Sequence, residues 1–293
     1  MATAWLIAGS SGMLGTALQR VLSERGIRFV APPESEFDIT DALAIEREVC
    51  KFAPSLAPFE RGILVNAAAY TNVERAEDEP QKAYLVNEEG PRLLARAAGA
   101  AGLGFVHVST DFVFDGDKIG PYAETDEPNP LSVYGASKLA GEAAVEKECP
   151  EALIVRTAWV FGPNGVNFPS KIISAAREQG ALSVVDDEIG SPTYTLDLAE
   201  GIVSLVLRGA APGLYHLAGA GTTSRYDMAI EVLRLAGIDV PVERAHSADF
   251  PTKAARPRNS TLDTSKAAEL GVVMPEWRNA LRRFIAETEG LRR

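Results

Sequence analysis

The chain has 293 residues, of which 46% are hydrophobic and 24% charged, and its formal net charge is −11. This composition is typical of a globular protein with one or two domains, and the acidic balance argues against a nucleic-acid or anionic-membrane partner. No apolar run approaches the roughly 20 residues of a membrane span, and two cysteines are too few for a disulfide framework, so we expect a cytoplasmic protein.

The N-terminal stretch has the pattern strand, glycine turn, helix. Residues 4–8 form a short apolar run typical of a buried strand, and a helix is predicted over 16–24. Between them lie Gly9, Gly12 and Gly15. In dinucleotide-binding folds such glycines permit a tight turn, close approach to a phosphate and close packing of the helix on the strand. The helix N-terminus would face a pyrophosphate with free N–H groups and a favourable dipole.

A second strand is expected over 27–31. Folds that select NAD often place an acid at the end of this strand, where it binds the ribose 2′-hydroxyl. Here Pro32 and Pro33 come instead, Glu34 lies just beyond, and no arginine for a 2′-phosphate is apparent. The pattern therefore leaves the choice between NADPH and NADH open.

Residues 37–41 predict a short strand followed by a helix cap. Asp38 could reach the adenine of a dinucleotide. Alternatively Thr40 or Asp41 simply caps the next helix, which is expected over 41–52, and both interpretations can hold together.

Two further strands are predicted over 62–66 and 105–108, and a long helix over 83–100 lies between them. Small residues after the first strand leave room for a ligand against the backbone. The second strand runs into Thr110, which we predict to bind a substrate carbonyl, although a hydroxyl at a strand end can also satisfy a local backbone group. His107, inside this apolar strand, is expected to be a core histidine.

Tyr134 and Lys138 lie four residues apart on a predicted helix, which places both side chains on one face. An ammonium beside a phenol favours the phenolate and so lowers the tyrosine pKa toward working pH. Such a tyrosine can exchange a proton with a carbonyl or an alcohol. The same spacing also occurs on solvated helix edges, so the functional interpretation depends on the motifs upstream.

The order of these elements predicts an α/β fold, a Rossmann doubly wound parallel sheet with a smaller discontinuous C-terminal substrate-binding domain. Further strands are expected over 153–157 and 213–218. The predicted domains are 1–165 plus 193–224 for the dinucleotide and 166–192 plus 225–293 for the substrate. Arg256 and Arg258 lie in a proline-flanked loop suited to a diphosphate, the alternative being solvent-facing arginines.

Together these motifs resemble the dTDP-4-dehydrorhamnose reductases, a family of extended short-chain dehydrogenase/reductases. The resemblance runs from near residue 5 to Trp277. The segments that carry it are the glycine turn, the Asn-Ala-Ala-Ala loop at 66–69, Ser-Thr-Asp-Phe-Val-Phe at 109–114, Tyr-Gly-Ala-Ser-Lys at 134–138, Arg-Thr-Ala-Trp at 156–159, Gly-Ser-Pro-Thr at 190–193 and Arg-Pro-Arg-Asn-Ser at 256–260.

The resemblance implies reduction of the 4-keto group of dTDP-4-dehydro-β-L-rhamnose to dTDP-L-rhamnose by NADPH or NADH. The implied catalytic residues are Thr110, Tyr134 and Lys138. The implied cofactor-binding residues are Gly9, Gly12, Met13, Leu14, Asp38, Ile39, Ala67, Ala68, Ala69, Tyr70, Thr71, Tyr134 and Lys138. The implied substrate-binding residues are Thr110, Asp111, Trp159, Asn167 and Arg256.

Some departures and alternatives stay open. Some relatives are associated with Mg²⁺ at a dimer contact through an acid that Ala17 replaces here, so we predict no metal, and a monomer or a homodimer. Phe112 stands where a dehydratase of this superfamily typically has a glutamate. The rival interpretations are a reductase of another dTDP-4-keto-6-deoxysugar and a non-catalytic binding module similar to the regulatory subunit of methionine adenosyltransferase.

Overall fold

The computed structural model describes residues 2–290 and contains a six-stranded sheet in the order β10-β5-β4-β3-β1-β2. All of its pairings are parallel. The strands are β1 (Thr3–Ala8), β2 (Arg28–Val30), β3 (Arg61–Asn66), β4 (Gly104–Thr110), β5 (Leu153–Thr157) and β10 (Gly213–His216). This arrangement confirms the predicted α/β fold.

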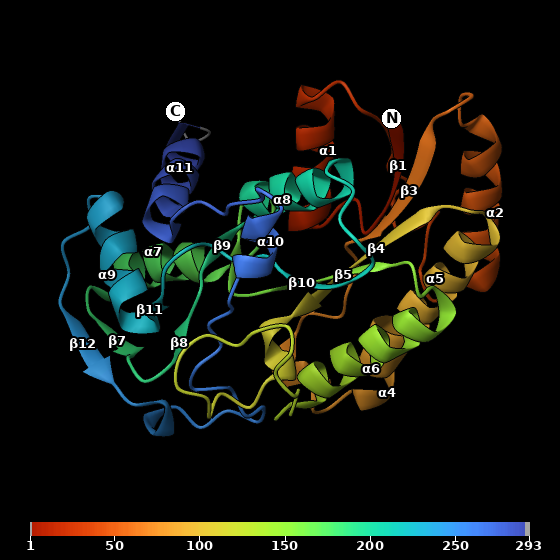
Figure 1. Cartoon of the computed structure of the whole chain (residues 1–293). Helices are drawn as coiled ribbons and strands as arrows, with labels where there is room; N and C mark the ends of the chain where they lie inside the picture. The colour runs from red at the N-terminus through yellow and green to blue at the C-terminus, as the bar shows by residue number, and fades with distance from the viewer. Residues whose placement is uncertain (1, 291–293) are drawn as a thin grey trace.

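Helices cover both faces of this sheet (Figure 1). Residues of α1 (Met13–Glu24) and α8 (Thr195–Leu207) share one hydrophobic core with the side chains of Trp5 and Ile7. Residues of α2 (Ala42–Phe52), α5 (Gly90–Ala100) and α6 (Val133–Glu148) share the other core with Ala4 and Leu6. Because both faces are covered, the central strands are continuous apolar runs, which explains why the sequence pattern located them.

A second lobe lies beside the sheet (Figure 1). Its three helices are α7 (Phe168–Gln179), α9 (Arg225–Leu235) and α11 (Trp277–Gly290). Three strand pairs accompany them: β7 (Leu182–Val185) with β12 (Val242–Ala245), β6 (Val160–Phe161) with β9 (Thr193–Tyr194), and β8 (Ile189–Gly190) with β11 (Thr223–Ser224). Phe161, Tyr194, Trp277 and Phe284 lie in its core.

The predicted domain boundaries stay a prediction. The second lobe has its own core, but Ala267 of α10 (Ser265–Glu269) and the following Met274 pack into the core between the sheet and α1. The C-terminal segment predicted for the substrate domain therefore also contributes to the sheet core.

Two local predictions need correction. No strand forms over 37–39; the chain there turns, and the carboxylate of Asp41 accepts a hydrogen bond from Leu43 N and caps α2. The helix expected over 83–100 is interrupted by a π-helical turn, η2 (Leu85–Glu89), between α4 (Pro80–Tyr84) and α5. The remaining short helices are α3 (Val73–Ala76), η1 (Ala53–Ser55), η3 (Asp111–Val113) and η4 (Ser247–Asp249).

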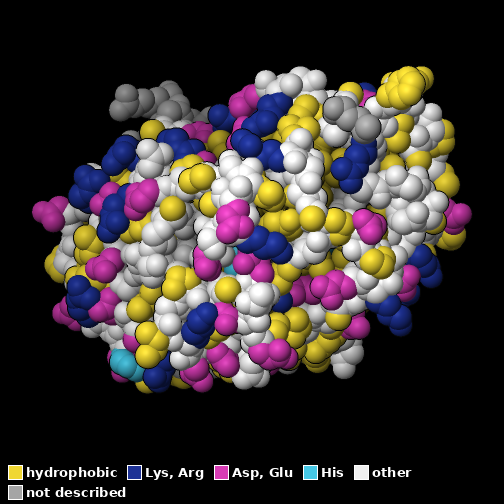
Figure 2. Space-filling view, viewed as in Figure 1, with side chains coloured by type: hydrophobic (Ala, Val, Ile, Leu, Met, Phe, Trp, Pro, Cys, Tyr) yellow, Lys and Arg dark blue, Asp and Glu magenta, His cyan; other side chains and the backbone are white. Residues whose placement is uncertain are grey.

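The surface shown in Figure 2 mixes acidic and basic side chains, with no broad area of a single sign on that face. Among the helices of residues 2–290, none is both long and apolar enough to cross a membrane.

Candidate active site

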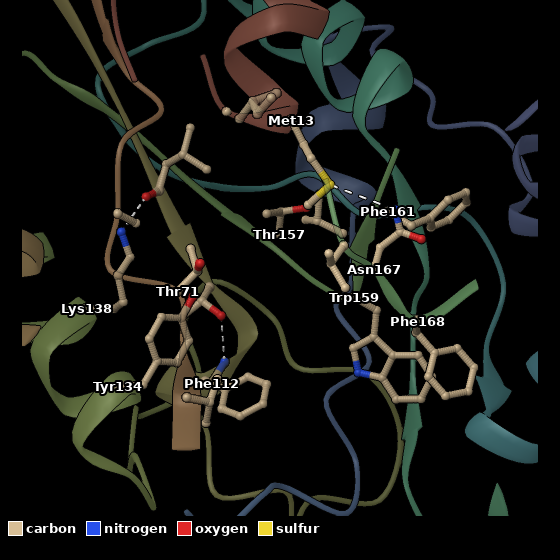
Figure 3. A pocket seen from close by; sticks show the side chains of 18 of the residues that line it. Met13, Thr71, Phe112, Tyr134, Lys138, Thr157, Trp159, Phe161, Asn167 and Phe168 are labelled. Atoms are coloured by element: carbon tan, nitrogen blue, oxygen red, sulfur yellow. Dashed lines mark hydrogen bonds between the residues drawn. The ribbon is translucent and has the colours of Figure 1, made fainter. Parts of the chain in front are cut away.

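A cavity of about 910 Å³ follows the carboxyl ends of the sheet strands and is bounded on its other side by residues of α7, β7 and α9. Figure 3 shows Tyr134 and Lys138 on one side of it and Trp159 and Phe168 on the other. Of the residues predicted for the site, Tyr70 and Arg258 do not line it. Those that do are Gly9, Gly12, Met13, Leu14, Asp38, Ile39, Ala67, Ala68, Ala69, Thr71, Thr110, Asp111, Tyr134, Lys138, Trp159, Asn167 and Arg256.

The glycine turn fits the pyrophosphate of a dinucleotide. Gly9 has a φ of +76°, and a methyl group there would lie 2.5 Å from Ala68 N. A methyl group on Gly15 would lie 2.1 Å from the Gly9 carbonyl oxygen, so this glycine allows α1 to approach β1. Gly12 begins α1 without a side-chain cap, and only the Gly9 oxygen lies near its open face. The first-turn N–H groups are thus left for an anionic ligand.

Helix α6 brings Tyr134 and Lys138 to the end of β4. The hydroxyl of Ser132 caps the helix by accepting a hydrogen bond from Gly135 N at 3.2 Å. Gly135 has no side chain at the point where α6 meets the chain after β4; a methyl group there would lie 2.2 Å from Phe112 O. The Tyr134 ring meets the Phe112 ring edge-on, with centroids 5.5 Å apart.

Burial sets the ionisation of both catalytic candidates. It raises the pKa of Tyr134 to about 12, although the hydrogen bond with the Thr110 hydroxyl acts to lower this pKa. It lowers the pKa of Lys138 to about 8, against the charge of Glu142. The predicted lowering of the tyrosine pKa by Lys138 is wrong for this arrangement, because the Lys138 ammonium donates to Val108 O at 2.7 Å and desolvation of the phenolate dominates. Tyr134 is therefore protonated at neutral pH, as a proton donor must be.

Thr110 and Asp111 complete this side of the cavity. The Thr110 hydroxyl accepts from Phe112 N at 3.2 Å and donates to Asp111 Oδ1 at 3.0 Å, so the local role considered from sequence is present. Burial raises the pKa of Asp111 to about 6, against the hydroxyls of Ser260 and Thr110 and the charge of Arg225. The Asp111 Oδ2 atom makes no hydrogen bond to any described residue, which leaves an acceptor for a ligand hydroxyl.

Asn87 links the Tyr70 backbone to α6, and the sequence analysis did not identify it. It lies in the π-helical turn η2 and is fully buried. Its side chain accepts from Tyr70 N at 2.8 Å and donates to Tyr70 O at 3.1 Å and to Ser137 Oγ at 3.0 Å. The Tyr70 hydroxyl turns away and donates to Glu79. The only signal in the sequence is a polar residue at helical spacing from the apolar Ala83 and Pro91.

Arg225, the first residue of α9, is the second functional candidate that the sequence did not reveal. Its guanidinium carbon lies 3.4 Å from the centroid of the Trp159 ring and 5.1 Å from that of Phe168. Trp159 has a φ of +45°, and its indole donates to Ser260 Oγ at 3.1 Å. A residue held in this strained conformation at a cavity is typical of a functional site. Arg225 thus adds a cation beside the predicted sugar contact.

Two predicted substrate ligands have protein partners. Asn167 caps α7, and its amide also donates to Gly162 O at 2.7 Å. Arg256 donates to Glu74 at 2.6 Å. His107 is fully buried, as expected of a core histidine, and burial holds its pKa well below the usual value. Within residues 2–290 no cluster of three or more potential ligands could hold a metal ion.

The comparisons with known proteins agree with this geometry. A family model described as the RmlD substrate binding domain matches residues 3–289. The dTDP-4-dehydrorhamnose reductase of Mycolicibacterium smegmatis is 39% identical over 99% of this chain and 87% of its own length. The chain belongs to the dTDP-4-dehydrorhamnose reductase family. It is accordingly an oxidoreductase, as the sequence predicted.

Two solved structures of this family are similar over nearly the whole chain. The dTDP-4-dehydrorhamnose reductase of Clostridium acetobutylicum has a TM-score of 0.92 and 36% identity, covering 98% of this chain and 99% of that one. The Bacillus anthracis reductase in complex with NADP has a TM-score of 0.91 and 34% identity, covering 98% of this chain and 100% of that one. A nicotinamide dinucleotide as cofactor, predicted from the glycine turn, agrees with that complex.

Proposed function

We propose that this enzyme, working in the cytoplasm, reduces the 4-keto group of dTDP-4-dehydro-β-L-rhamnose to the alcohol of dTDP-L-rhamnose. The observation that carries the proposal is the meeting of Thr110, Tyr134 and Lys138 at the cavity that also contains the glycine turn. The names of the family members in Mycolicibacterium smegmatis and Clostridium acetobutylicum support the choice of substrate.

Thr110, Tyr134 and Lys138 each have a separate role in the reduction. A bound nicotinamide dinucleotide supplies the hydride for C4 of the sugar. When substrate binds, the Thr110 hydroxyl turns its proton from Asp111 to the carbonyl oxygen, on which negative charge develops. The Tyr134 hydroxyl then gives its proton to that oxygen, which completes the alcohol. We expect Lys138 to act by donating to the nicotinamide ribose, and not by lowering the pKa of Tyr134, which burial raises.

The test is loss of nicotinamide absorbance on mixing the protein with dTDP-4-dehydro-L-rhamnose and NADPH or NADH, with the product identified by mass and NMR. We expect turnover in the wild type and a loss of about 10² to 10⁴ in kcat for Tyr134→Phe, the usual size of one general-acid contribution. Turnover of other dTDP-4-keto-6-deoxysugars alone would contradict the substrate. Tight cofactor binding without turnover of any of them would favour a binding module.

A further inference from the structure

We propose that the hydroxyl of Thr157 binds the carboxamide group of the nicotinamide ring. Thr157 is the last residue of β5 and lines the cavity, although only 5% of the residue is exposed. The inference rests on two parts of the proposed function, the nicotinamide cofactor and the contact of Thr110 with the carbonyl, and does not depend on the identity of the sugar.

The Thr157 hydroxyl lacks a protein partner. Three side chains that line the cavity have a buried polar atom that makes no hydrogen bond within residues 2–290, namely those of Ser109, Asp111 and Thr157. Leaving a buried hydroxyl unpaired costs free energy, so an unpaired group at a cavity is a candidate for contact with a ligand. The Asp111 carboxylate suits a ligand hydroxyl, which leaves the two hydroxyl groups to be distinguished.

The register of the sheet separates these two hydroxyls. Ser109 lies opposite Arg156, whose guanidinium pairs with Glu142 of α6 at 2.6 and 2.9 Å, so Ser109 faces α6. Side chains alternate along a strand, and Thr157 therefore faces the other side of the sheet together with Val155. Val155 belongs to the core that α1 covers. The Thr157 hydroxyl thus lies on the side of α1, whose first turn would hold the pyrophosphate.

Thr157 is also the register partner of Thr110 on β4. Neighbouring strands lie about 4.8 Å apart, and the side chains of paired residues point to the same face. In the proposed reaction Thr110 binds the carbonyl oxygen, and the hydride comes from C4 of the nicotinamide. The carboxamide is attached to C3, next to C4, so it must lie close to the reacting carbonyl. A contact one strand away from Thr110 matches this requirement.

The chemistry of a hydroxyl also suits an amide, because each group can both donate and accept a hydrogen bond. In the view of Figure 3, Thr157 lies between Lys138, which we expect to donate to the nicotinamide ribose, and Asn167. Contacts at the ribose and at the carboxamide would together fix the rotation of the ring about the bond that joins them. Thr157 would thereby determine which face of the nicotinamide meets the sugar.

The experiment is calorimetric titration of the purified enzyme, without any sugar, with NADPH and with 2′-phospho-ADP-ribose, which is NADPH without its nicotinamide. We expect Thr157→Val, a change of nearly the same shape, to weaken NADPH binding by about five- to fiftyfold, because a buried amide group loses its partner. Binding of 2′-phospho-ADP-ribose should stay within about twofold. Thr157→Ser keeps the hydroxyl and should restore NADPH binding to within about threefold of the wild type.

The matched control is Thr195→Val. Thr195 begins α8, and its hydroxyl is likewise buried without a partner in the described part of the chain, but it does not line the cavity. This variant should bind both ligands as the wild type does. Without ligand, Thr157→Val should melt at the same or a higher temperature, because a methyl group replaces an unpaired hydroxyl.

Unchanged NADPH binding by Thr157→Val would overturn the proposal, and so would equal weakening of both ligands, which would indicate a general distortion of the site. A lower melting temperature of this variant would also overturn it, since the hydroxyl would then have a partner within the protein. If the wild type binds neither ligand, the cofactor assignment fails as well. Selective weakening of NADPH binding in an enzyme that reduces no dTDP-sugar would support the contact while contradicting the proposed substrate.

Discussion

The buried charge of Lys138 should measurably lower the free energy of unfolding. Its side chain is 2% exposed, and its pKa falls from 10.5 to about 8. Between about pH 8 and 10.5 the unfolded chain binds more protons at this site than the folded chain, so the lysine's contribution to stability rises with pH across that window.

We therefore predict that Lys138→Met stabilises the fold at pH 7 by about 1 to 3 kcal/mol while abolishing reduction. The advantage over the wild type should shrink at pH 9.5, where the wild-type lysine is largely neutral. Thermal melting at both pH values checks this. A destabilised variant at pH 7, or an advantage that grows with pH, would contradict the assignment.

Arg225 offers the cavity a flat cation against Trp159. Its guanidinium also lies 3.6 Å from Glu188, and burial lowers its pKa to about 10, so it stays charged at neutral pH. An arginine in such a position can bind a diphosphate with two parallel hydrogen bonds.

We predict that Arg225→Gln weakens binding of dTDP by about 10- to 100-fold in calorimetric titration, because one charge-assisted contact is lost. Arg234→Gln is the matched control, since Arg234 is an exposed residue of the same helix that pairs with Glu231. If both variants bind dTDP with the same affinity, Arg225 does not contact the diphosphate.

At the scale of elements, the close approach of α6 to the π-helical turn η2 constrains the position of the helix that carries Tyr134 and Lys138. A methyl group on Gly141 of α6 would lie 2.0 Å from the Asn87 carbonyl oxygen. We predict that Gly141→Ala destabilises the fold by about 1 to 3 kcal/mol and lowers kcat, because α6, which carries Tyr134 and Lys138, must shift away from η2.

The control for this substitution is Gly99→Ala in α5. There the added methyl group would lie 3.7 Å from its nearest neighbour, Glu148 O, which is an ordinary contact. Alanine favours a helix by up to about 1 kcal/mol over glycine, so this variant should be neutral or stabilised. The free energies of unfolding of both variants in urea separate the cost of the steric clash at Gly141 from the gain in helix propensity.

Strands and the glycine turn were predictable because they are local. A buried parallel strand is an apolar run of its own, and Gly9 and Gly15 mark a turn whatever else the chain contains. The stack of Arg225 on Trp159 was not predictable, because the two residues lie far apart in the sequence and nothing in either segment points to the other. The high pKa of Tyr134 was missed for a similar reason: desolvation depends on packing that spacing does not describe.

At the scale of the whole molecule, a strap of ion pairs joins the loop before α10 to α3 and the residues after it. Lys253 donates to Asp78 at 2.6 and 2.7 Å, and Arg256 donates to Glu74 at 2.6 Å. These side chains are largely exposed, so the pairs should add less than about 1 kcal/mol to stability. The strap matters more for ligand binding, since it occupies the arginine predicted for the diphosphate.

We predict that Glu74→Gln tightens dTDP binding by about two- to tenfold, because Arg256 no longer has to leave a carboxylate, with little change in melting temperature. Asp78→Asn serves as the control: it weakens the same strap at Lys253 and leaves Arg256 paired. Calorimetric titration with dTDP compares the variants. If both tighten binding equally, loosening of the strap and not release of Arg256 is responsible.

Because of where the three tryptophans lie, the intrinsic fluorescence of the protein can report ligand binding. Trp5 and Trp277 are fully buried in separate cores, whereas Trp159 lines the cavity under the Arg225 guanidinium. Among them only the indole of Trp159 can meet a nucleotide sugar directly. A change in the intrinsic emission of this enzyme on mixing with a sugar nucleotide would therefore originate at the part of the cavity that Trp159 lines, and its rate would follow entry of the ligand without any label.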